Sequence, residues 1–174
     1  MKTHDTKSVL LVGVGGQGTI LASKILTAGL IAAGYDVKMS EVHGMSQRGG
    51  SVSTQVRYGT KVYSPIIGRG QADILVAFET MEAIRYLPDL KPGGKVVVND
   101  YQMPSLPILS GEREYPDSIL EELRSKADSA VDGYTESKTI DEAISEAEWS
   151  VDILRCAVRR HTRRRRNRKA RGEE

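Results

Sequence analysis

Residues 9–26 read VLLVGVGGQGTILASKIL, and this stretch decides the fold. Its first four residues are all apolar, as in a strand that is buried on both faces. Gly13, Gly15 and Gly18 then follow in G-x-G-x-x-G spacing, and apolar residues recur after them at helical spacing. The stretch therefore predicts a strand, a tight glycine turn and a helix.

The start of this predicted helix is suited to an anion. The first N–H groups of a helix have no partner within it, and they lie at the positive end of its dipole. We expect this turn to bind a phosphate or another anion, with the site residues Gly13, Gly15, Gly16, Gln17 and Gly18. In the alternative interpretation, the glycines only let the helix pack closely on the sheet.

Further apolar segments predict a doubly wound α/β domain. We expect strands at 8–12, 37–42, 73–78 and 95–99, and helices at 16–33 and 79–86. The first strand, the first helix and the second strand form a βαβ unit, for which we expect a parallel pair with a right-handed crossover. The predicted fold is α/β, with three Rossmann-like layers around a doubly wound, mostly parallel sheet.

Other segments are less regular. Residues 51–58 alternate polar and apolar side chains, which favours an antiparallel or edge strand that turns back into 61–63 as an antiparallel hairpin. We also expect Thr80 to cap the helix that Pro88 ends. Further elements are expected as a short strand at 108–109, a helix from Pro116 to about Ala127, a last strand at 130–131 and an amphipathic helix at 137–154.

A polar loop, HGMSQRGG at 43–50, follows the second predicted strand directly. Loops at the carboxyl ends of parallel strands are where open α/β sheets bind ligands. We therefore add Ser46, Gln47, Arg48 and Gly49 to the candidate binding site, as contacts to a cofactor, a substrate or a partner subunit. A solvated loop with turn glycines is the alternative interpretation.

His43 and Arg48 are the candidate catalytic residues of this loop. An arginine donates two parallel hydrogen bonds to a carboxylate or phosphate, and a histidine transfers protons near neutral pH. We expect the main role of both residues to be positioning at an interface with a partner, and proton transfer to be a lesser role.

Length and composition favour one cytoplasmic domain. The chain has 174 residues, and its single cysteine, Cys156, can form neither an internal disulfide nor, alone, an iron–sulfur or structural zinc site. No apolar run approaches the roughly 20 residues that cross a bilayer, and the polar N-terminus lacks the apolar stretch of a secretory signal. We expect no metal site and no membrane contact.

The charge is divided unevenly along the chain. Residues 155–174 hold ten of the 25 basic and two of the 23 acidic residues, which leaves a net charge of −6 on the first 154 residues. We place one domain at 8–154, between a disordered terminus at 1–7 and a basic, disordered tail at 155–174. The composition of the tail motivates the hypothesis that it is encoded in a shifted reading frame, which translation of the coding DNA in the other frames would test.

The sequence resembles a known family, the gamma-type subunits or domains of the 2-oxoacid:ferredoxin oxidoreductases, and within it the indolepyruvate enzymes. The resemblance covers about residues 7–130. It rests on GVGGQG at 13–18, SEVHGMSQRGGSV at 40–52, ADIL at 72–75 and KPGGKVVVN at 91–99.

The resemblance implies oxidative decarboxylation of a 2-oxoacid, most closely indolepyruvate or another aryl pyruvate, to a coenzyme A thioester. Thiamine diphosphate and iron–sulfur clusters would reside on a larger alpha subunit, which passes electrons to ferredoxin. This chain alone would bind none of these cofactors and would be inactive, because decarboxylation needs an electron sink that side chains do not supply. It would place the 41–51 loop against that partner.

Two rival functions follow from the residues. A nicotinamide-dependent dehydrogenase would use the glycine turn for pyrophosphate and Glu41, about 20 residues beyond Gly18, for a ribose hydroxyl. A nucleic-acid-binding protein would use the arginine run of the tail. We find no convincing catalytic set for the first and no aromatic stacking platform for the second, so nucleic-acid binding is not expected.

Overall fold

The computed structural model describes residues 6–44, 49–104, 106–130 and 134–137. These form one six-stranded sheet in the order β2-β3-β1-β4-β5-β6. The strands are β1 (Lys7–Val14), β2 (Asp36–His43), β3 (Ser51–Gly59), β4 (Ala72–Ala77), β5 (Leu90–Asn99) and β6 (Tyr134–Ser137). The helices are α1 (Thr19–Ala32), α2 (Thr80–Tyr86), η1 (Leu87–Asp89, a 3₁₀ turn), α3 (Leu106–Leu109) and α4 (Ile119–Ala130).

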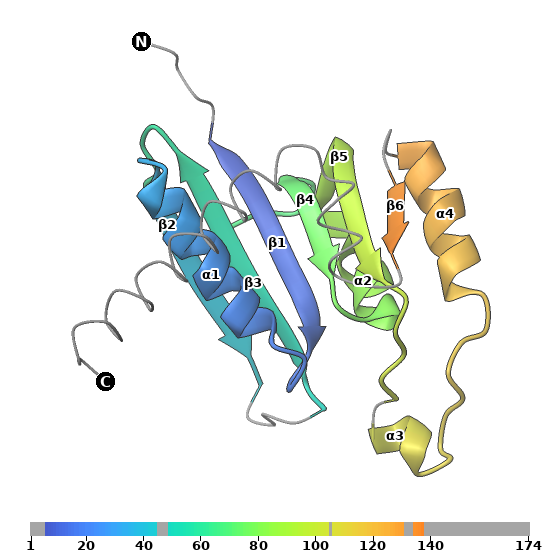
Figure 1. Cartoon of the computed structure of the whole chain (residues 1–174). Coiled ribbons are helices and arrows are strands. Elements are labelled where there is room, and N and C mark those ends of the chain that lie inside the picture. The colour runs from blue at the N-terminus through green and yellow to red at the C-terminus, as the bar shows by residue number, and fades with distance from the viewer. Residues whose placement is uncertain (1–5, 45–48, 105, 131–133, 138–174) are drawn as a thin grey trace, which may run out of the picture.

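The predicted three-layer, doubly wound α/β architecture is confirmed. Figure 1 shows α1 over β2 and β3 on one side of the sheet, and α4 beside β6. One core cluster joins odd-numbered β1 residues, such as Val9 and Leu11, to Leu30 of α1. Another joins the even-numbered Leu10 and Val12 to α2 and α4. Because successive side chains of a strand point to opposite faces, the buried run of β1 serves both clusters.

The expected parallel pair of β1 and β2 is wrong, because β3 lies between them. β3 pairs antiparallel with β1, from Lys7↔Tyr58 to Val14↔Ser51, and antiparallel with β2. The remaining neighbours, β1 with β4, β4 with β5 and β5 with β6, are parallel. β1 and β2 therefore run in the same direction without touching, and β3 alone runs against the others.

The alternation of residues 51–58 correctly predicted antiparallel pairing, but the edge position and the hairpin with 61–63 are wrong. One face of β3 buries Val56 and Tyr58 against the α1 side. On the other face, Gln55 accepts from the backbone N–H of Ile67 at 2.7 Å, and Arg57 donates to the backbone carbonyls of the same loop. The loop after β3 thus forms hydrogen bonds with the polar side chains of this face. These side chains therefore do not depend on solvent at a sheet edge for their hydrogen bonds.

Several boundaries differ from those expected. Residues 108–109 belong to the short helix α3 rather than to a strand, and Ala130 ends α4 instead of beginning the last strand. α4 begins after Ser118 rather than at Pro116, and the φ of 89° at Ser118 lies outside the helical region. Ser137 ends β6, and the rest of the helix expected at 137–154 lies outside the described residues, as do 1–5 and the tail.

Candidate functional site

The glycine turn connects the carboxyl end of β1 to the start of α1. Gly16 and Gly18 have φ values of 106° and 84°, which favour glycine. Gly13 is buried, and glycine is needed there for a different reason. A Cβ at this position would lie 2.8 Å from Thr19 Oγ1, 2.9 Å from Gln17 Oε1 and 3.0 Å from Phe78 Cβ. The first glycine therefore permits close packing, and the two later ones permit the turn.

Gln17 has a clear structural contact at each end of its side-chain amide. Its Oε1 accepts from the backbone N–H of Val14 at 2.7 Å, and its Nε2 donates to the carbonyl of Phe78 at 2.9 Å. Asn99 donates to the same carbonyl at 3.2 Å. The amide of Gln17 thus ties the glycine turn to the ends of β4 and β5, which is a role that sequence reasoning missed.

The two glycine-bearing segments meet in the structure. The backbone N–H of Gly15 donates to the carbonyl of Gly50 at 2.8 Å, and that of Gly49 donates to the carbonyl of Gly15 at 3.5 Å. These contacts continue the β1–β3 ladder beyond Val14↔Ser51. The antiparallel insertion of β3 is what brings these segments together.

Some candidate residues of the polar loop are placed and others are not. His43 is exposed at the end of β2, where its Nδ1 lies 3.3 Å from the carbonyl of Gly44, and Gly49 is exposed with a φ of 75°. Ser46, Gln47 and Arg48 lie outside the described residues. The suggested catalytic roles of His43 and Arg48 stay predictions.

The local electrostatics at the start of α1 favour an anion. The N-cap residue Gly18 supplies no side-chain hydrogen bond, and the first turn of α1 contains no acidic residue. Gly16 and Gly18 are exposed, so a ligand can approach the backbone here. Within the described ranges, the buried hydroxyl of Thr19 has no hydrogen-bond partner. The positive end of the helix dipole is therefore left without a negative side chain.

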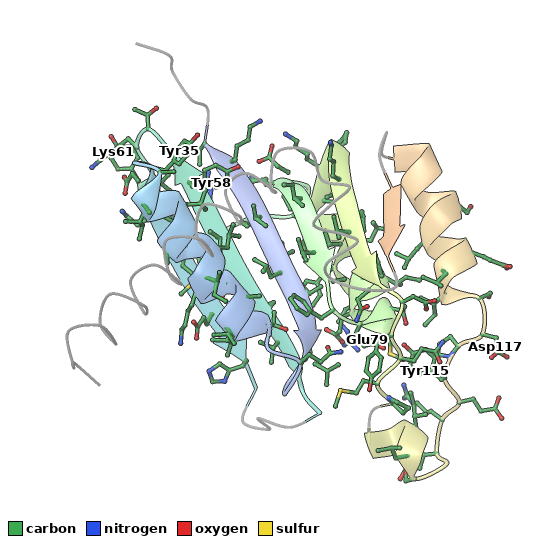
Figure 2. The ribbon with its side chains drawn as sticks, viewed as in Figure 1. Tyr35, Tyr58, Lys61, Glu79, Tyr115 and Asp117 are labelled. Carbon is green, nitrogen blue, oxygen red and sulfur yellow. The ribbon has the colours of Figure 1, made fainter. Side chains whose placement is uncertain are left out.

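Two carboxylates that sequence reasoning left without a role, Glu79 and Glu82, lie beside this turn, one immediately before α2 and one in its first turn. Glu79, rather than the expected Thr80, caps α2 by accepting from the backbone N–H of Glu82 at 2.9 Å. An N-cap carboxylate accepts a hydrogen bond from the backbone N–H three residues further along the helix. The hydroxyl of Thr80 instead forms a hydrogen bond with the hydroxyl of Tyr115. Figure 2 shows Glu79 and Tyr115 together at this end of the sheet.

Glu82 connects α2 to the start of β3. Its carboxylate accepts from the hydroxyl of Ser51 and lies 3.1 Å from Nε of Arg85. Burial raises the pKa of Glu82, and the nearby charge of Glu79 acts in the same direction. Glu79 directly follows the predicted strand at 73–78, and this position is the one sequence signal that could have drawn attention to it; Glu82, inside the predicted helix, has no such signal.

Glu41 is poorly placed for the dinucleotide site of the rival dehydrogenase. That site needs the acidic residue at the end of a strand next to β1. Here β3 separates the two strands, so β2 lies about 10 Å from β1. Glu41 instead faces Lys24 of α1, with 3.8 Å between the carboxylate and the ammonium group.

A family model described as pyruvate ferredoxin/flavodoxin oxidoreductase matches residues 8–137 of the chain. The chain belongs to this family. The resemblance drawn from the glycine turn and the HGMSQRGG loop is thereby confirmed.

Curated relatives carry related names. The indolepyruvate oxidoreductase subunit IorB of Pyrococcus horikoshii is 43% identical over 117 residues, which are 67% of this chain and 57% of that protein. The subunit of the same name from Thermococcus kodakarensis is 43% identical over 109 residues, 63% of this chain and 54% of its own length. The 2-oxoglutarate synthase subunit KorC of Methanothermobacter marburgensis is 34% identical over 102 residues, which are 53% of this chain and 50% of that protein.

The chain spans little more than half the length of these curated relatives. Over the part that the structure describes, no helix has the length and apolar character to cross a membrane. The same part contains no cluster of three or more histidine, cysteine, aspartate or glutamate side chains arranged for a metal ion.

Proposed function

We propose that the chain is a subunit of a 2-oxoacid:ferredoxin oxidoreductase of the indolepyruvate type, located in the cytoplasm. It supports the oxidative decarboxylation of an aryl 2-oxoacid to an acyl-coenzyme A, with electrons passing to ferredoxin. The observation that carries the proposal is the junction of the two glycine segments, Gly15 with Gly49 and Gly50, in a chain of this family. Gly16, Gly18 and Gly49 beside that junction are exposed, so a neighbour can cover it.

The redox and carbon chemistry belongs to a larger partner in this proposal. An iron–sulfur cluster takes about four thiolates, and the whole chain has one cysteine, so this donor set does not fit a cluster. Thiamine diphosphate would supply the electron sink for decarboxylation, and we assign it to the partner too. The larger alpha subunit is therefore the expected neighbour, and ferredoxin meets the complex through it.

The solvent side of α1 supports such a neighbour. Apart from Lys24, its exposed residues are apolar or small: Leu21 is 64% exposed, Ile25 41% and Ile31 58%, and Ala28 is exposed as well. Lys24 is the one charged residue of this helix. A helix that is apolar on both faces is normally buried on both. We assign this α1 face to the larger subunit because α1 starts at the glycine turn, so both surfaces are continuous.

Reconstitution tests the proposed function directly. We expect the purified chain alone to show no indolepyruvate oxidation, and the chain mixed with the larger subunit to reduce ferredoxin when coenzyme A and indolepyruvate are present. The larger subunit without this chain is the control. Oxidation of the ketoacid by this chain unaided, or full activity of the larger subunit without it, would contradict the proposal.

We also propose that the glycine turn binds a phosphate-bearing group, through the backbone of residues 13–18 and residues of the 43–50 loop. Titration with inorganic pyrophosphate, followed by NMR of the amides of Gly16, Gly18 and Thr19, is expected to show saturable shifts that weaken as salt increases. NAD(H) at the same concentrations is the comparison. Tighter binding of NAD(H) than of pyrophosphate would favour the dehydrogenase instead.

A further inference from the structure

The carboxylate of Glu79 is fully buried at the junction between β4 and α2, with 1% of the residue exposed. One oxygen caps α2 through the N–H of Glu82. The other accepts from the backbone N–H of Met103 at 3.3 Å and from the hydroxyl of Tyr115. A buried carboxylate is costly unless hydrogen bonds compensate its lost hydration, and here both oxygens are used.

A cap needs only one of these oxygens. The second one reaches partners 24 and 36 residues further along the chain, in residues 101–104 and 106–115, which we name the returning segment. Thr80 adds two more bonds to that segment, from its N–H to the carbonyl of Tyr101 at 3.1 Å and between its hydroxyl and that of Tyr115 at 2.7 Å. The start of α2 thus holds the returning segment at several points.

The residue before Glu79 holds the glycine turn. The carbonyl of Phe78 accepts from Nε2 of Gln17 at 2.9 Å, and Oε1 of the same amide accepts from the N–H of Val14 at 2.7 Å. A short, hydrogen-bonded path therefore runs from Tyr115 through Glu79, along one peptide unit to Phe78, and through Gln17 to the backbone of the turn. We name this path the brace.

We propose that Glu79 is a positioning residue: through the brace, it and Tyr115 hold the glycine turn in the geometry that receives the phosphate-bearing group. This inference rests on the anion site of the proposed function, and it adds the residues that set the shape of that site. Glu79 and Tyr115 contact no ligand in this proposal. They fix the direction of the Phe78 carbonyl, which in turn fixes the amide of Gln17.

The Tyr115→Phe variant tests the brace, because it removes one hydroxyl and leaves the capping of α2 intact. We expect the amide of Val14 to exchange with deuterium about tenfold faster, as for the loss of one supporting hydrogen bond, while amides in the middle of β1 keep their rates. We expect the affinity for inorganic pyrophosphate to fall several-fold. The matched control is Tyr63→Phe, whose side chain is 88% exposed and should change neither value.

Glu79→Gln provides the second variant. Glutamine offers one accepting oxygen, so it can cap α2 or hold Met103 but not both, and it should reproduce the faster exchange at Val14. Unchanged exchange at Val14 in both folded variants would overturn the inference. A uniform rise in exchange along β1 would also overturn it, since that result indicates general destabilisation. If the wild-type chain binds no pyrophosphate, the anion site fails, and exchange at Val14 alone decides whether the brace exists.

Discussion

Replacing Gly13 by alanine is expected to lower the free energy of unfolding by about 2–3 kcal/mol, as for an overpacked core position. The new methyl group would lie under 3.0 Å from Thr19 Oγ1 and Gln17 Oε1, and at 3.0 Å from Phe78 Cβ. Moving Gln17 aside breaks its bonds to Val14 and Phe78, and the Cβ of Phe78 cannot swing away by a rotamer change. Urea unfolding followed by circular dichroism measures the loss.

Gly16→Ala is the matched control for this prediction. Nothing lies within 4 Å of a Cβ at that position, so only the φ of 106° opposes the change. The expected cost is about 1–2 kcal/mol, the penalty of a side chain in left-handed backbone. A Gly13→Ala variant as stable as the wild type would show that the turn is looser than these contacts indicate.

A double substitution in the middle of α1, Ile25→Lys with Ala28→Arg, is expected to weaken assembly with the larger subunit by about 100-fold or more. Two cations would have to be desolvated against an apolar neighbour, and charges at the centre of an interface are costly unless paired. Both positions are exposed in the free chain, so the free energy of unfolding should change by less than about 0.5 kcal/mol. Isothermal titration with the larger subunit gives the affinity.

The control places the same two charges on another surface. Tyr63→Lys with Ile66→Arg changes two exposed hydrophobic residues, 88% and 57% exposed, in the loop between β3 and β4. This variant should assemble like the wild type. Equal affinities for both double variants would remove the α1 face from the interface, and equal losses would show that any added positive charge disturbs assembly.

The region around β1 and α1 could be predicted from the sequence because each local signal agreed with the fold. An apolar run, three spaced glycines and a helical period specify a strand–turn–helix within a few residues of one another. The same local rules also gave the ends of α2 closely, although Glu79 rather than Thr80 proved to be the cap.

The position of β3 could not be predicted in this way, because strand order depends on contacts far apart in the sequence. Gln55 and Arg57 suggest a solvent-exposed face. Only the fold shows that the loop after β3 donates a hydrogen bond to Gln55 and accepts hydrogen bonds from Arg57. The brace was missed for the same reason. Nothing in the sequence around Gln17 indicates its bond to the carbonyl of Phe78, and nothing around Glu79 indicates its bond to the hydroxyl of Tyr115.

The reversed strand also affects how the nascent chain folds. β2 and β3 are joined by a short connection, so they can form a hairpin soon after both leave the ribosome. β1 is synthesised before the other strands of this sheet, and both of its neighbours, β3 and β4, come later. Its apolar residues therefore have no partner strand until β3 has been made, and the second partner, β4, is complete only after more than half of the described residues have been synthesised. This interval is when a chaperone has most to protect.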